Sequence, residues 1–211
     1  MAAAGSWPSI AAHGLRSTSA LLDLFEITGG AREAIESQHR PDYISINHPA
    51  YGQARIRDQK PMDDSGLRRA LTGTDLTPSD WYRTLNRKVF FWLTEERLSR
   101  MLGAGAYRKS QHTVITLETS ALVEAHIDDI TLSAINSGAT KPMPKARGPN
   151  TFRRLGEFPY DELRSRRRRL DVVVELAVEY AVPQIDKFVV DVRDLSASDL
   201  PSRRQVLRAS P

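Results

Sequence analysis

The chain has 211 residues, of which 40% are hydrophobic and 27% are charged, and these fractions are typical of a folded globular protein. It contains no cysteine, which excludes disulfide bonds, thiolate zinc sites and cysteine nucleophiles. No apolar run approaches the roughly 20 residues of a membrane-spanning helix, and the first residues lack the features of a signal peptide. We therefore expect a cytoplasmic protein without a membrane segment, with one domain over residues 1–195 and a flexible tail over residues 196–211.

The formal net charge is +4 and the isoelectric point is about 9.5, which favours an anionic partner. Arg164 and residues 166–169 supply much of this positive charge. Such a run can follow a nucleic-acid backbone by releasing its counterions, and it can equally be the solvated face of a helix. The charge pattern leaves both interpretations open.

The first half of the chain is predicted to be mainly helical. Helices are expected over residues 7–13, after Ser17 and over residues 31–38, and two more near Leu67 and after Thr77. Pro78 and Asp80 are typical of the first turn of the last of these helices. Residues 44–61 contain Gly52 and two prolines, and we expect them to be irregular.

The strands are predicted from residue 89 onward. Five apolar residues at positions 89–93 predict a strand covered on both faces, followed by a helix that Thr94 caps. Further strands are expected over residues 113–118, 130–135 and 188–192. Three prolines and two glycines predict a long loop over residues 136–150, and a basic helix is expected over residues 160–170.

Glu175 lies in the middle of a predicted strand over residues 171–179. Apolar residues at positions 172, 174, 176 and 178 alternate onto one face, which is typical of a half-buried strand. Glu175 therefore points to the opposite face. It is either part of a solvated surface or a carboxylate that a rigid strand directs into a cleft.

Two arginines and two aromatic residues are candidates for binding a nucleotide. Arg55 and Arg57 flank Ile56, so an extended backbone places both guanidinium groups on one side, where they could bind a pyrophosphate. Phe91 and Trp92 could flank a flat ring. The alternatives are surface arginines and ordinary core aromatics.

Several common sites have no support in the sequence. The five histidines form no i, i+4 pair and have no acidic ligand motif around them, so we expect no metal site. There is no P-loop, no GxGxxG dinucleotide motif and no GxSxG hydrolase motif.

Three segments, taken in order, resemble the ADP-ribosyltransferase fold. They are WPSIAAHGL at residues 7–15, KVFFWLTEERL at residues 88–98 and VVELAV at residues 173–178. Among proteins with this fold, the DarT-type toxins that modify DNA are the most similar. The similarity is remote, because it lies in the order and pattern of these segments and not in residue identity. The whole chain also resembles an uncharacterised bacterial family through the blocks IRDQ, VFFW and INSGAT.

The resemblance implies an α+β fold in which a split, mostly antiparallel sheet surrounded by helices holds NAD, the substrate, in a cleft. It implies that Glu175 is the catalytic carboxylate and that Arg57, or else Arg55, binds the NAD phosphates, with His13, Phe91 and Trp92 also at the cofactor. The loop before the glutamate strand would recognise the acceptor, which the basic helix suggests is a nucleic acid. The expected acceptor residues are Asn136, Ser137, Arg147, Arg166 and Arg167.

Members of the resembling family usually begin with a strand that carries a Tyr-His pair before the first helix. Here the first helix is expected at Trp7, with no such strand before it, so that either the start lies too far downstream or the pocket lacks one wall.

Two further functions are compatible with the same fold. One is an inert module that binds nucleic acid or another anionic partner, and the other is NAD-dependent removal of an RNA phosphate. An antitoxin-like protein is a further possible partner.

Overall fold

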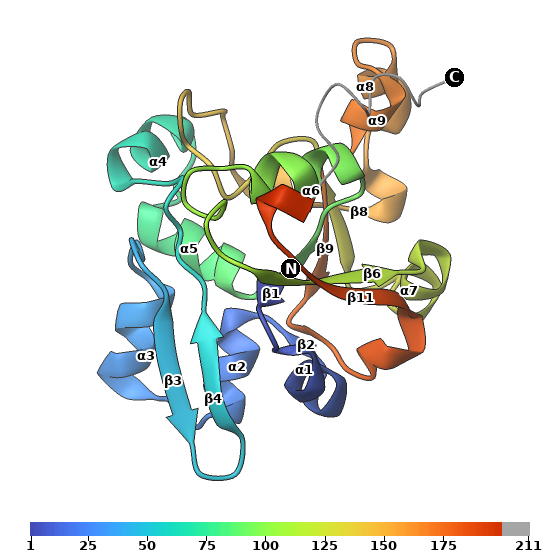
Figure 1. Cartoon of the computed structure of the whole chain (residues 1–211). Helices are drawn as coiled ribbons and strands as arrows, with labels where there is room; N and C mark the ends of the chain where they lie inside the picture. Colours follow the sequence, from blue (N-terminus) through green and yellow to red (C-terminus); the bar gives the residue numbers. More distant parts are fainter. Residues whose placement is uncertain (200–211) are drawn as a thin grey trace.

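The computed structural model describes residues 1–199, which form an α+β fold of small antiparallel sheets surrounded by helices (Figure 1). The predicted fold class is confirmed at this level. The helices are α1 (Trp7–His13), α2 (Thr18–Leu24), α3 (Gly29–Glu36), α4 (Asp64–Ala70), α5 (Pro78–Asn86), α6 (Glu95–Leu102), α7 (Thr119–Ala125), α8 (Tyr160–Arg164) and α9 (Arg169–Val172). Most of the predicted tail, residues 200–211, lies outside the described residues.

The sheet that carries Glu175 has the strand order β5-β9-β7-β8. Its strands are β5 (Lys88–Phe91), β9 (Glu175–Glu179), β7 (Ile130–Ser133) and β8 (Arg153–Arg154). Leu176 of β9 lies between Phe91 of β5 and Leu132 of β7, and Glu175 pairs with Ser133. Glu175 is therefore on a central strand, with a neighbouring strand on each side.

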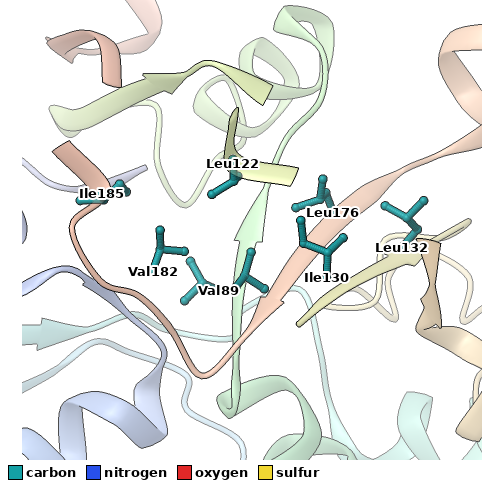
Figure 2. Close-up of a cluster of buried hydrophobic side chains, with 8 residues drawn as sticks. Val89, Leu122, Ile130, Leu132, Leu176, Val182 and Ile185 are labelled. Carbon is teal, nitrogen blue, oxygen red and sulfur yellow. The ribbon is translucent and has the colours of Figure 1, made fainter. Parts of the chain in front are cut away.

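Both faces of this sheet are covered by apolar side chains. One face carries alternate residues of the three longer strands and packs against Leu122 of α7 (Figure 2). These strand residues are Val89, Ile130, Leu132, Leu176 and Val178. The opposite face, on which Glu175 and Ala177 lie with Phe90, packs against helices α4 and α5. The prediction of a half-buried strand was wrong, because residues 175–178 are all buried.

A second sheet has the order β1-β6-β11, with strands β1 (Ala2–Ala3), β6 (His112–Leu117) and β11 (Val189–Leu195). A separate two-stranded ladder joins β2 (Leu15–Arg16) to β10 (Ala181–Val182). A two-residue strand, β1, does precede the first helix, and its Ala2 and Ala3 pair with Thr113 and His112, but it does not carry the Tyr-His pair of the resembling family.

Residues 44–56 form a hairpin, where an irregular segment was expected. Strands β3 (Ile44–His48) and β4 (Gly52–Ile56) pair along their whole length and pack against α2 and α3, at the lower left of Figure 1. Gly52, with φ of 68°, permits the turn. The sequence signal was weak because only Ile46 and Ile56 of the ten strand residues are buried.

The predicted basic helix over residues 160–170 is interrupted. Helix α8 ends at Arg164, and α9 covers only Arg169–Val172, so that Asp171 and Val172 belong to a helix and not to the glutamate strand. Both short helices project at the upper right of Figure 1. Neither helix has a side-chain N-cap, and the arginine run between them offers no apolar face to bury.

Candidate functional site

Glu175 is the first residue of β9, and its side chain is buried. It is 4% exposed, and it is the only acidic residue in the buried set among residues 1–199. Its backbone pairs with Ser133 of β7, and the strand pairs with β5 from Leu176 onward, so the position of the carboxylate is set by the sheet. The carboxylate therefore lies inside the protein and not on a solvated face, which excludes the surface alternative for this residue.

The Glu175 carboxylate accepts a hydrogen bond from the loop that follows β7. The backbone N–H of Ser137 donates to both carboxylate oxygens, with N···O distances of 3.2 and 3.1 Å. A carboxylate can accept about four hydrogen bonds. A single shared N–H therefore leaves acceptor positions open.

Burial changes the acidity of Glu175. Removing the carboxylate from water disfavours its charged form and raises its pKa from 4.5 to about 7. Hydrogen bonding from Ser137 and the positive charges of Arg147 and Arg97 act in the opposite direction but are weaker than the burial effect. Glu175 therefore changes its charge near neutral pH.

Arg147 holds the loop over Glu175 in a closed shape. Its guanidinium group is buried and donates to three carbonyl oxygens of the loop, those of Ser137 (2.7 Å), Ala139 (2.8 Å) and Lys145 (3.1 Å). The guanidinium carbon lies 5.7 Å from the ring centre of Trp81. Arg147 therefore shapes the loop from within, and its side chain does not point towards solvent.

The same loop is also attached to α4 and α5. The Trp81 indole N–H donates to the Ser137 carbonyl at 3.3 Å, and the Arg147 backbone N–H donates to the Ala70 carbonyl at 2.9 Å. The Thr140 backbone N–H donates to the Pro61 carbonyl at 2.9 Å. Asn136, in contrast, is exposed and accepts a local hydrogen bond from Gly138.

A hollow of about 340 Å³ adjoins the loop. It is lined by Ala134, Ile135, Arg147, Gly148 and Asn150, among others. Arg167 donates to the Ala134 carbonyl at 2.7 Å, which joins the arginine run to this end of the loop. Of the expected acceptor residues, the structure thus brings Ser137, Arg147 and Arg167 to the Glu175 region.

Arg166 lies apart from this group. Its side chain is 74% exposed and pairs with Glu162 at 3.5 Å. It belongs to the projecting arginine surface between α8 and α9.

Sequence reasoning did not identify Arg97, which acts on the charge of Glu175 from helix α6. Its guanidinium donates to Asp171 at 3.2 Å, and its side chain is 15% exposed. No local pattern distinguishes it from the other arginines of the chain. Its role depends on α6 and α9 lying next to the start of β9.

The residues expected to bind a cofactor are distributed over several places. Arg55 lies over the Tyr43 ring at 4.4 Å, and Arg57 lies over the Tyr107 ring at 4.6 Å. The two guanidinium groups therefore stack on different rings, where a shared site was predicted. The charge of Arg57 acts on His112 and on the Met1 amino group.

The other expected cofactor residues also have partners within the protein. His13 contacts Tyr51 edge-on, with 5.2 Å between ring centres. Phe91 packs against the core of the sheet, and the Trp92 indole N–H donates to the Met101 sulfur at 2.9 Å. Because Phe91 pairs with Leu176, Trp92 follows directly at the end of the sheet where β9 begins.

Within residues 1–199, no three His, Asp or Glu side chains group in a way that could hold a metal ion. Over the same residues, no helix is both long and apolar enough to cross a membrane.

Neither a curated protein nor a solved structure matches the chain. A family model matches residues 1–189, and the chain therefore belongs to DUF7002, a family of unknown function.

Proposed function

We propose that the chain is an NAD-dependent ADP-ribosyltransferase in which Glu175 is the catalytic carboxylate. The bond between nicotinamide and the ribose anomeric carbon breaks, and an acceptor nucleophile forms a new bond to that carbon. Nicotinamide leaves, and the acceptor loses its proton. A carboxylate next to the ribose stabilises the positive charge that develops in the oxocarbenium-like transition state.

The observation that carries this proposal is the buried, incompletely hydrogen-bonded Glu175 carboxylate on a central strand. Its remaining acceptor positions suit the hydroxyl groups of a ribose, since Ser137 is the one residue among residues 1–199 that hydrogen-bonds to the carboxylate. Its pKa of about 7 also suits proton transfer near neutral pH. A carboxylate without such a role would more commonly lie in water.

The proposal requires a movement of the loop at residues 136–150. The Glu175 side chain is only 4% exposed, so a dinucleotide can reach the carboxylate only when the loop shifts. The proposal assigns the NAD diphosphate to Arg57, as the sequence resemblance implies. Arg97 offers a second cation, since its charge acts on Glu175.

The proposed acceptor is a nucleic acid. The seven arginines and four acidic residues between positions 153 and 171 give this segment a net charge of +3, compared with +4 for the whole chain. Phosphate groups bind such a surface by displacing counterions. The contact of Arg167 with Ala134 joins this surface to the loop over Glu175.

The test is transfer of label from radioactive NAD to single-stranded DNA, RNA or protein by the full chain. We expect Glu175→Gln to abolish labelling and Glu179→Gln to retain it. Glu179 is a matched control, because it lies on the same strand but pairs with Arg87 and Lys88. Equal labelling by the Glu175→Gln variant would remove this residue from the mechanism.

A second candidate function is an inert module that binds an anionic partner. It is favoured by the hydrogen bond from Ser137, because Glu175 then acts as an anchor for the loop. This function predicts oligonucleotide binding that weakens steeply with salt, without any product from NAD. Fluorescence anisotropy at increasing salt, combined with the labelling assay, distinguishes the two candidates.

A further inference from the structure

A polar hollow of about 490 Å³ lies where three helices meet, and the proposed reaction does not use it. It is formed by residues 37–39, which follow α3, by α4 and by the start of α5, and these helices lie together on the left side of Figure 1. Its volume is within the range of small-molecule sites, which is about 300–1,000 Å³. Charged and polar side chains from all three segments line it.

A hydrogen-bonded pair, the buried Tyr82 and the exposed Asp64, lines the hollow. Tyr82 is 1% exposed, and its hydroxyl donates to one oxygen of Asp64 at 2.8 Å. Burial and the Asp64 carboxylate raise the pKa of Tyr82, so its hydroxyl keeps its proton. The other oxygen of Asp64 has no hydrogen-bond partner among residues 1–199.

Within residues 1–199, this arrangement leaves Arg68 without an ion partner. It is four residues after Asp64 on α4, a spacing at which an acid and an arginine commonly pair on a helix. Asp64 bonds to Tyr82 instead, and within the described part of the chain the Arg68 guanidinium forms no ion pair. Within residues 1–199, the Arg68 guanidinium group and a carboxylate oxygen of Asp64 without a hydrogen-bond partner therefore line the same hollow.

His39 adds a second acceptor to the lining of the hollow. Its Nε2 lies 3.0 Å from the Gln59 carbonyl oxygen, which can only accept, so Nε2 carries the hydrogen. The other nitrogen of the neutral ring is then an acceptor, and no partner for it is found over residues 1–199. The first amides of α5 contribute little, because Thr77 and Asp80 already cap each other.

We propose that this hollow binds a small zwitterion of the α-amino acid class. The carboxylate of the ligand pairs with the Arg68 fork, and its ammonium group donates to Asp64 and His39. Arginine suits the carboxylate because its planar donors match the two oxygens. The ligand side chain lies in the remaining volume. Because this hollow is formed by α3, α4 and α5, the inference does not depend on the transferase proposal.

The test is a titration of the isotope-labelled full chain with each of the twenty protein amino acids, followed by amide NMR. We expect at least one of them to give saturable shifts at residues 37–39, 64–68 and 77–82. Acetate carries only the carboxylate and methylammonium carries only the ammonium group, so each is expected to bind much more weakly than the amino acid. Acetate binding as tightly as the amino acid would overturn the zwitterion class, and the absence of any saturable shift would overturn the site.

Two variants complete the test. Arg68→Gln should weaken binding about tenfold or more, since it removes a charged hydrogen-bond pair. Arg69→Gln is the matched control, because it is the next residue on α4, is also exposed and does not line the hollow. Both positions are on the surface, so amide spectra should show the native fold. Unchanged affinity of the Arg68→Gln variant would refute the proposal.

Discussion

Replacing Glu175 by glutamine should change how the stability of the protein depends on pH. The unfolded chain releases the Glu175 proton near pH 4.5, whereas burial delays this release to about pH 7 in the folded protein. Between these values the folded state binds more protons than the unfolded state, so its stability falls as the pH rises. At about 1.4 kcal/mol per pH unit, the loss from this group is roughly 3 kcal/mol by pH 8.

The Glu175→Gln variant keeps a neutral side chain at every pH and should avoid this loss. We expect the variant and the native protein to differ little at pH 5, and the variant to be more stable by about 2–3 kcal/mol at pH 8. The assay is urea unfolding at a series of pH values, with the free energy of unfolding compared at constant slope.

Glu179→Gln provides the control for this comparison. Its ion pairs with Lys88 and Arg87 lower the pKa of Glu179, so its contribution to stability is present above the unfolded pKa and is lost as the pH falls. The two variants should therefore deviate from the native protein in opposite directions with pH. Identical pH profiles for the native protein and the Glu175→Gln variant would mean that the carboxylate is not held in a desolvated position.

Three further outcomes follow from the same contacts. Arg147→Gln removes three hydrogen bonds to loop carbonyls and should lower the free energy of unfolding by about 3 kcal/mol, measured by urea unfolding. Arg97→Gln should raise the pKa of Glu175 further, because it removes a positive charge that lowers this pKa, and carbon NMR of the carboxyl group can follow the titration. Leu176→Ala should cost about 2–5 kcal/mol in thermal or urea unfolding, since Leu176 is 3% exposed in the sheet core. No loss of stability in this last variant would contradict the packing of β9.

Features that depend on neighbours along the chain could be predicted from the sequence. The helix start at Thr77, with Pro78 and Asp80 in the first turn, was predicted, and there Thr77 and Asp80 cap each other because both groups lie within one turn. Residues 89–91 of the apolar run at residues 89–93 lie in β5, whose two faces pack against apolar side chains, whereas Trp92 and Leu93 follow the strand. The long loop at residues 136–150 was expected from its prolines and glycines, since these residues prevent a regular element.

Features that depend on distant segments were decided only by the tertiary structure. Glu175 was predicted to be on a strand, but its burial results from β7, from Ser137 and from α4 and α5, which are separate in sequence. No local pattern around Arg147 distinguishes a buried arginine that hydrogen-bonds to loop carbonyls from an arginine on the surface. Alternation and capping are set by bonds within a few residues, whereas removing a charge from water requires segments that the chain brings together only on folding.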